Sequence, residues 1–448
     1  MSIELAPLAT RFVRLAEQLG ADEAEVYIVS EEEKDLSFVD KVESAESSSS
    51  TGLGVRLVLA KRVGLSAATS LTLREGEKTV RRAYSIARVG EPIEDWVSLP
   101  VRFGKSSVLG VFDKETAQLA PETLTWTALQ MLKTVHSQGN NFSVTRGDIS
   151  IGIEKTLIAN SHGCNIEREE SYVSTYLSVK AEDGVNKGLS SEASQSHDWR
   201  KIDFISLSER ATERALKATE ARQILGGELP VLWRNKLFAS ILRIMFGGTL
   251  TAEAVQKRRS PWREKVGTVI ADRNVNLIDD GLMPNGMGTR GFDDDGLPQQ
   301  RTSLVDAGVL RGFLYDTFTG NKDHVDSTGN ASRSYGHAPA PAPNNLLLIP
   351  GKVSLDEMVK ETKRGLYVED AIGLWLSNAV SGNLSATATN AYLIENGVLT
   401  QPVKGMLISG SFFQILKKGI DFIGSDLEHD GNAYSPSVCV SGLKLTPA

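Results

Sequence analysis

Apolar residues follow two spacings in the first half of the chain, and these spacings predict alternating helices and strands. The first predicted helix carries apolar residues about one turn apart: Leu5, Leu8, Phe12, Leu15 and Leu19. Gly20 follows them and is suited to end a helix. Three further helices are predicted at residues 73–88, 121–135 and 207–221. Short apolar or alternating runs predict half-buried strands at residues 26–29, 36–39, 53–59, 149–159 and 172–180.

The helix–strand–helix order occurs twice in the first half, on either side of a connecting segment at residues 90–120. Internal duplication and the ordinary alternation of an α+β domain both explain this order. One sequence does not decide between them. We expect residues 1–225 to form an N-terminal α+β domain of mainly antiparallel sheet with helices.

The second half, residues 226–448, is richer in Gly and in short strands. A first strand is predicted at residues 229–233, followed by a buried helix at residues 237–246 that ends at a Gly pair. Two segments predict tight hairpins with Gly in the turn, at residues 304–310 and 393–399. A helix and a strand are predicted between the hairpins, at residues 353–363 and 365–368. We therefore predict an α+β protein whose C-terminal domain is strand-rich with a few helices.

Composition limits the cellular setting and the class of partner. The net charge of -7 and the pI near 5.6 give no electrostatic reason to expect nucleic acid. Cys164 and Cys439 are the only cysteines, so a disulfide framework is not expected. The first residues lack the pattern of a signal peptide, and no apolar run approaches the ~18 residues of a membrane span. We expect a cytoplasmic protein with no membrane partner.

Two short segments carry candidate chemistry in the first half. Residues 44–50 are serine-rich, which is typical of a solvated hairpin tip or of a mobile loop near a binding site, and we favour the hairpin tip. His162 and Cys164 place two metal-capable side chains within three residues. A zinc site needs three or four ligands, and nothing nearby supplies the rest, so we expect a structural role for both.

The histidines are too widely spaced for a helical zinc site. Such a site needs ligands about one turn apart, as in H-E-x-x-H. No two of the six histidines lie four or five residues apart: His136, His162, His197, His324, His337 and His429.

A series of short motifs nevertheless resembles the TldD/TldE (PmbA) peptidase family from about residue 20 to the C-terminus. The resemblance lies in the order of many motifs, since each alone is weak. In the C-terminal half they are Gly288-Thr-Arg-Gly-Phe-Asp-Asp-Asp-Gly296, Leu314-Tyr-Asp316, Ser327-Thr-Gly-Asn330, Ser381-Gly-Asn383, Asn396-Gly397 and Leu407-Ile-Ser-Gly410. In the N-terminal half they are Thr51-Gly-Leu-Gly-Val-Arg56 and Ala159-Asn-Ser-His-Gly163.

The resemblance implies which kind of subunit this chain is. TldD-type subunits carry H-E-x-x-x-H on the first helix of the C-terminal domain and a cysteine ligand near the C-terminus, whereas TldE-type subunits lack the motif. Here the corresponding helix offers apolar side chains instead, at Ile241, Ile244, Met245 and Phe246. Cys439 is better explained as a small buried residue of the last strand. The chain therefore resembles a TldE (PmbA) subunit, with no catalytic or metal-binding residue of its own.

The same resemblance implies the partner, the cofactor and the substrate. The chain is expected to form a heterodimer with a TldD-like catalytic subunit, which would hold the zinc and cut small or unfolded peptides. When alone, it is expected to be able to form a homodimer. We predict groove or partner contacts at the residues of two Gly-containing loops: Asp293, Asp294, Gly296, Arg301, Ser327, Thr328, Gly329 and Asn330.

Other interpretations of these loops and of the whole chain remain open. Asp-Asp-Asp-Gly and Ser-Thr-Gly-Asn are also good turn sequences, with purely structural roles. Adjacent acids do not point the same way, which disfavours a Ca²⁺ or Mg²⁺ site. The alternatives for the chain are a peptide-binding or regulatory homodimer without proteolysis and an independent hydrolase with a Ser, Asp or Cys nucleophile. The sequence contains no G-x-S-x-G motif that would support the latter.

Overall fold

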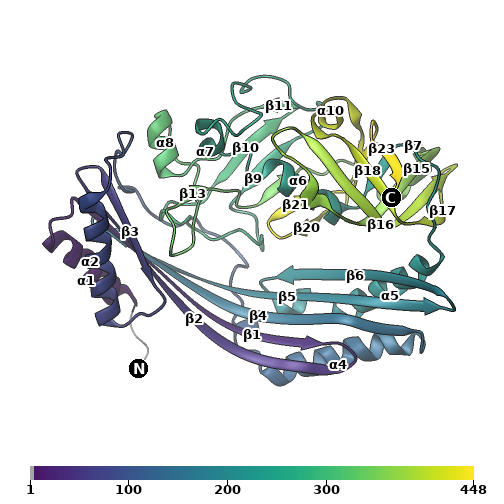
Figure 1. Cartoon of the computed structure of the whole chain (residues 1–448), viewed down its shortest axis with the longest axis horizontal. Coiled ribbons are helices and arrows are strands. Elements are labelled where there is room, and N and C mark those ends of the chain that lie inside the picture. Colours follow the sequence, from purple (N-terminus) through teal and green to yellow (C-terminus); the bar gives the residue numbers. More distant parts are fainter. Residues whose placement is uncertain (1–4) are drawn as a thin grey trace.

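The computed structural model describes residues 5–448 and has the predicted α+β fold (Figure 1). Its N-terminal part contains these elements: α1 (Leu5–Gln18), β1 (Glu23–Phe38), β2 (Val42–Leu59), β3 (Arg62–Ala68), α2 (Leu73–Val89), α3 (Lys114–Ala117), α4 (Pro121–Ser137), β4 (Phe142–Asn160), β5 (Asn165–Asp183), β6 (Asn186–Ser196) and α5 (Phe204–Glu220). The six strands form one antiparallel sheet in the order β3-β2-β1-β4-β5-β6. All four predicted helices are present.

The order α-β-β-β-α occurs twice in this part, with β1 and β4 paired at the centre of the sheet. The two copies also share a close contact between a helix and the third strand. A Cβ atom built on Gly64 in β3 would lie 2.0 Å from the carbonyl oxygen of Ala83, and one on Gly188 in β6 would lie 2.0 Å from that of Ala215. This repeated packing favours the duplication interpretation.

The strands are longer than predicted. β1 joins the two strands predicted at residues 26–29 and 36–39, and β2 includes the serine-rich residues 44–50. The favoured prediction of a hairpin tip at these serines is therefore wrong, because the turn lies at residues 39–41. Glu31–Lys34 pair with Ser47–Ser50 at mid-strand. Backbone pairing with β1 keeps the serines extended without an apolar pattern.

Two separate cores explain where the apolar pattern was visible. One core packs α1 and α2 against one end of the long strands, and the other packs α4 and α5 against the opposite end. Between these ends the strands carry polar residues and run alongside the C-terminal part in Figure 1. Residues 53–59 were predicted to be half-buried, yet both faces are covered, because Arg56 pairs with Asp295 and Val58 packs with Trp96.

The C-terminal part is strand-rich, as predicted. Its elements are β7 (Gly227–Glu228), β8 (Val231–Trp233), α6 (Asn235–Phe246), α7 (Ala252–Gln256), β9 (Leu277–Asp280), β10 (Arg301–Asp306), β11 (Val309–Leu310), α8 (Thr317–Asp323), β12 (Ala331–Ser332), β13 (Ala340–Pro341), β14 (Leu346–Leu348), α9 (Leu355–Glu361), β15 (Arg364–Ile372), β16 (Asn383–Glu395), β17 (Val398–Val403), β18 (Met406–Ser411), α10 (Phe412–Gln414), β19 (Ile420–Ile423), β20 (Glu428–Asp430), β21 (Ala433–Ser435), β22 (Val438–Val440) and β23 (Lys444–Pro447). One sheet has the order β19-β22-β8-β15-β16-β18-β23-β7, with β17 on β16. Another has the order β11-β10-β9-β14-β21-β20.

Both predicted hairpins are confirmed, and their turns have the expected backbone. Ala307 and Gly308 connect β10 to β11 with φ angles of 47° and 77°. Asn396 and Gly397 connect β16 to β17 with φ angles of 51° and 77°. Positive φ at both central residues is the signature of a tight turn that matches the twist of the strands.

One expectation about position is corrected. Cys439 is buried in a strand as predicted, but β22 is followed by β23, so that strand is not the last one. Within the described residues, no helix is both long and apolar enough to cross a membrane.

Candidate functional site

The motif positions of helix α6 face the apolar core of the C-terminal part. Ile241, Met245 and Phe246 are buried, and Ile244 packs against the same core from a half-buried position. The ring of Phe246 lies 5.7 Å from that of Trp262 and packs edge-on against Phe412 at 5.3 Å. Apolar side chains in such surroundings supply no ligand for a metal ion.

The polar face of α6 is directed toward β20. Ser240 Oγ and Arg243 Nη2 each donate to Asp430 Oδ2 over 2.7 Å. The neighbouring His429 stacks on Tyr434, and burial lowers its pKa. One histidine and one carboxylate do not complete a zinc site, and no group of three His, Cys, Asp or Glu side chains among residues 5–448 is placed to hold a metal. The side chains of this helix therefore do not fit zinc.

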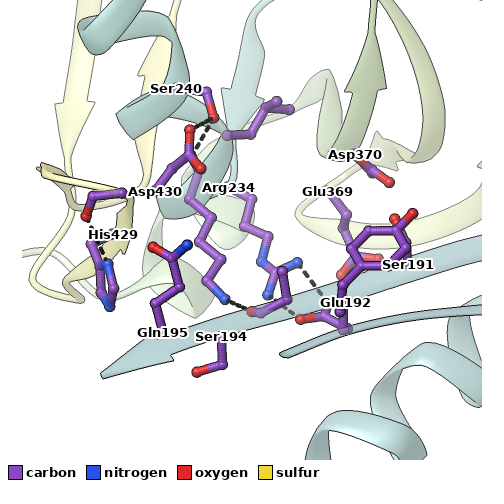
Figure 2. A pocket seen from close by; sticks show the side chains of 15 residues that line it. Ser191, Glu192, Ser194, Gln195, Arg234, Ser240, Glu369, Asp370, His429 and Asp430 are labelled. Carbon is purple, nitrogen blue, oxygen red and sulfur yellow. Dashed lines mark hydrogen bonds and ion pairs between the residues drawn. The ribbon is translucent and has the colours of Figure 1, made fainter. Parts of the chain in front are cut away.

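A cleft lies between the start of α6 and the edge strand β6 of the N-terminal sheet (Figure 2). Its walls are strongly charged. Glu192 on β6 is buried and pairs with Arg234 over 2.9 Å and also with Arg214. Arg214 in turn pairs with Glu369 over 3.1 Å. Asp370 stands apart from these pairs in Figure 2, and burial raises its pKa.

The cleft continues along β6 into a larger and more apolar cavity of about 970 Å³. The two share three lining residues, namely Tyr176, Ser191 and Asp370. Lys236, in the first turn of α6, donates to the carbonyl oxygen of Ala193 on β6, and burial lowers its pKa to about 8. The cleft thus follows β6 from one end to the other.

The predicted groove residues of the acidic loop lie elsewhere, at the contact between the N- and C-terminal parts. Asp293 and Asp294 are buried, and their oxygens accept bonds within the chain. Asp293 accepts from the amides of Asp295, Leu297 and Ala331, and burial raises its pKa well above the ordinary range. Asp294 accepts from Arg168 over 2.7 Å; burial opposes ionisation, but this arginine and its neighbours hold the pKa of Asp294 below its ordinary value.

Most of the remaining predicted groove residues contact other parts of the chain, and only Arg301 is exposed. Gly296 lies against Cys164, since a Cβ on it would be 3.3 Å from the sulfur. The Ser327–Asn330 loop secures other backbone: Ser327 Oγ donates to the carbonyl of Tyr315 over 3.0 Å and Thr328 Oγ1 accepts from its amide over 2.7 Å. Gly329 lies against Pro298, and Asn330 is buried beside Asp279. Arg301 is exposed, 3.9 Å from Asp280.

The side chains of His162 and Cys164 contact different groups and do not form a shared site. His162 Nε2 contacts Glu23 Oε1 over 2.7 Å, and the same carboxylate accepts from Trp96 and the amide of Leu99. Cys164 is buried in an apolar cluster with Phe292, and burial raises its pKa to about 12.

Comparison with known domains covers most of the chain. Residues 24–87, 116–219 and 226–447 match, in order, the PmbA/TldA metallopeptidase domain 1, central domain and C-terminal domain. The chain belongs to the PmbA/TldD metallopeptidase family. Similar proteins include an uncharacterised protein of Methanocaldococcus jannaschii, 29% identical over 96% of this chain and 98% of that protein. A metalloprotease of the same organism is 24% identical over 91% of this chain and 90% of its own length.

A solved structure has the same fold over nearly the whole length of this PmbA/TldD family chain. The crystal structure of TldE from Thermococcus kodakarensis matches with a TM-score of 0.91, at 23% sequence identity, over 98% of this chain and 100% of that one. At this identity the match establishes the fold.

The charged cleft between α6 and β6 was not predicted from the sequence. Its charged residues come from several elements: Glu192, Arg234, Glu369 and Asp370 line it, and Arg214 pairs with Glu192 and Glu369. The available signal was weak: Glu192 is an acid in the otherwise small and neutral stretch of β6, and Glu369 and Asp370 follow the apolar residues of β15. Without the fold, nothing in the sequence brings these positions together.

Proposed function

We propose that this chain is a TldE (PmbA)-type subunit that does not itself carry out catalysis. It pairs with a TldD-like subunit that holds the zinc, and the pair degrades small or unfolded peptides. The observation that carries this proposal is the composition of α6, whose motif positions Ile241, Met245 and Phe246 are committed to the apolar core. A zinc site on this helix would require polar ligands at the positions where removal of these apolar side chains would open a cavity in the core.

The names of similar proteins point in the same direction. A relative from Methanocaldococcus jannaschii is described as a metalloprotease, and the structure from Thermococcus kodakarensis is described as TldE. Proteolysis and subunit type are carried over to this chain as part of the proposal.

The test is reconstitution with a chain from the same genome that contains H-E-x-x-x-H. We expect the two purified chains to form a stable heterodimer by light scattering. We also expect the mixture to cleave an unfolded substrate such as casein, lose activity to a chelator and recover it with zinc. Failure of this chain to bind any such partner would overturn the proposal.

A metal measurement on the chain alone gives an independent check. The chain purified by itself is expected to contain far less than one zinc per molecule, because α6 offers no ligand set. Stoichiometric zinc that survives dialysis would contradict the proposal, since it would reveal a site that the helix does not provide.

The same assay separates the two alternatives. Chelator-resistant cleavage by the chain alone would favour an independent hydrolase. Neither cysteine is suited to be its nucleophile, because burial raises the pKa of both Cys164 and Cys439 to about 12. Ser334 Oγ does contact His337 Nδ1 over 2.8 Å, but within a local turn. Peptide binding by a homodimer that pairs with no TldD-like subunit and cleaves nothing would favour the regulatory interpretation.

A further inference from the structure

Strand β6 is not free to pair with a peptide strand, although it is the edge of its sheet. Side chains from the C-terminal part already donate to its outward carbonyl oxygens. Lys404 Nζ donates to Lys187 over 3.3 Å and Asn390 Nδ2 donates to Leu189 over 3.2 Å. Lys236 donates to Ala193 in the same way. A ligand of the adjoining cavity must therefore be held by groups other than the β6 carbonyls.

The middle of this cavity has exposed apolar walls. Leu189 on β6 is 57% exposed and Ile372 at the end of β15 is 55% exposed, and both line the same cavity of about 970 Å³. Ala388 on β16 also lines this cavity. Exposed apolar side chains in a cavity favour the binding of an apolar group, because its transfer from water is favourable.

The two ends of the cavity carry opposite charges that lack ion-pair partners. Asp370 accepts only from the amide of Ala371 and forms no ion pair among residues 5–448; burial raises its pKa, although Arg234 and Arg214 act on it in the opposite direction from beyond ion-pair distance. At the other end, Lys404 donates to two carbonyls and retains one N–H. Arg222 uses Nη1 for two carbonyls and retains Nε and Nη2. Neither cation has an acidic partner in the described part of the chain.

We propose that this cavity binds a short peptide with free termini, its amino group at Asp370, an apolar side chain between Leu189 and Ile372, and its carboxylate at Lys404 and Arg222. The spacing suits such a ligand. Asp370 and Ser191 both lie where the cleft and the cavity meet, and Lys404 is bonded at Lys187, four residues before Ser191 on β6. At about 3.4 Å per residue this separation is roughly 14 Å, the length of an extended peptide of four or five residues.

The ligand class rests on the proposed role in peptide degradation, but the binding site is tested on this chain alone. Isothermal titration with Ala-Leu-Ala-Ala at pH 7 measures the affinity, and versions with an acetylated amino end or an amidated carboxyl end remove one charge each. We expect each modification to weaken binding about tenfold, because it removes a charge-assisted contact.

Single substitutions test which residues contact the peptide. Asp370→Asn is expected to weaken binding of the free peptide and to abolish the difference between free and acetylated peptides. Asp356→Asn, at an exposed carboxylate on α9, is the matched control and should change neither. Leu189→Gln should weaken binding severalfold, whereas Val185→Gln, at a 95% exposed residue outside the cavity, should not.

Equal affinity for free and blocked peptides, or an unchanged acetylation effect in Asp370→Asn, would overturn the proposal. These outcomes are separate from the reconstitution test. A chain that binds the tetrapeptide but no TldD-like partner would contradict only the subunit role, and a heterodimer whose chain fails the titration would contradict only the peptide site.

Discussion

Arg168 on β5 donates to Asp294 over 2.7 Å and so fastens the N-terminal sheet to the acidic loop of the C-terminal part. Both side chains are almost fully buried. Arg168 also donates to the carbonyl of Phe292 over 3.0 Å and lies over its ring. The second oxygen of Asp294 accepts from the amide of Arg333. The acidic loop therefore acts as a structural joint between the two parts.

Removing one member of this pair should destabilise the protein strongly. Asp294→Asn leaves the buried guanidinium of Arg168 with only Glu170, 3.4 Å away, as an anionic partner, and we expect a loss of about 3 to 5 kcal/mol in the free energy of unfolding. Chemical denaturation followed by fluorescence measures this loss. In a double-mutant cycle, Arg168→Met combined with Asp294→Asn should cost less than the sum of the two single changes. Additive losses would show that the two residues do not interact.

The repeated contact in the N-terminal sheet predicts equal sensitivity at two glycines. Gly64→Ala and Gly188→Ala each place a methyl group 2.0 Å from a helix carbonyl oxygen. We expect each to lower the free energy of unfolding by about 1 to 3 kcal/mol, because the helix must move away from the strand. Gly312→Ala is the control, with no atom within 4 Å of its Cβ, and should stay within about 0.5 kcal/mol of the wild type. An unchanged free energy of unfolding in Gly188→Ala would contradict the proposed similarity of packing at the two glycines.

The fold was predictable where one physical rule determined the local structure. Helical spacing located α1, α2, α4 and α5, and the Gly turns located both hairpins. The strand at residues 44–50 was missed because nothing apolar marks this stretch. Its residues 47–50 are held extended by pairing with the preceding strand β1. Pairing of polar strands leaves no periodic apolar signal in the sequence.

The site was harder to predict than the fold. The motif helix was located correctly from its apolar residues, and Ile241 and Met245 are indeed buried. Asp293 and Asp294 attracted attention as a dense acidic group, but Arg168 and Arg333, which act on Asp294, come from distant segments. Charge density in sequence does not reveal burial or pairing, which arise only when the two parts of the chain come together.

The two cysteines should be unreactive in the native protein. Burial raises the pKa of both Cys164 and Cys439 to about 12, so the thiolate fraction at pH 8 is smaller than for an ordinary thiol by roughly three orders of magnitude. We expect a disulfide reagent such as DTNB to label neither cysteine within minutes in native buffer and both in guanidinium. Rapid labelling of one native thiol would contradict its burial. It would also support the alternative that the chain is a hydrolase with a cysteine nucleophile.

The burial of Asp279 on β9 leads us to predict that the stability of the protein depends on pH between acid and neutral values. Its carboxylate is fully buried, with Oδ2 accepting from Asn330 over 2.7 Å and Oδ1 lacking a partner among residues 5–448. Burial raises the pKa of Asp279 from 3.8 to about 7. Between these values the folded chain binds more protons at this residue than the unfolded chain, so this contribution to stability falls as pH rises from 4 to 7.

Asp279→Asn keeps the shape and the acceptor for Asn330 but does not titrate. Between pH 4 and pH 8 we expect the wild type to lose roughly 3 to 4 kcal/mol of unfolding free energy relative to this variant. Urea denaturation at several pH values measures the difference, in which the other titrating groups cancel. Asp183→Asn, at an exposed carboxylate, should keep the wild-type pH profile. Parallel curves for the wild type and Asp279→Asn would mean that Asp279 is ionised in the folded protein, and that the buried amides around it stabilise the charge.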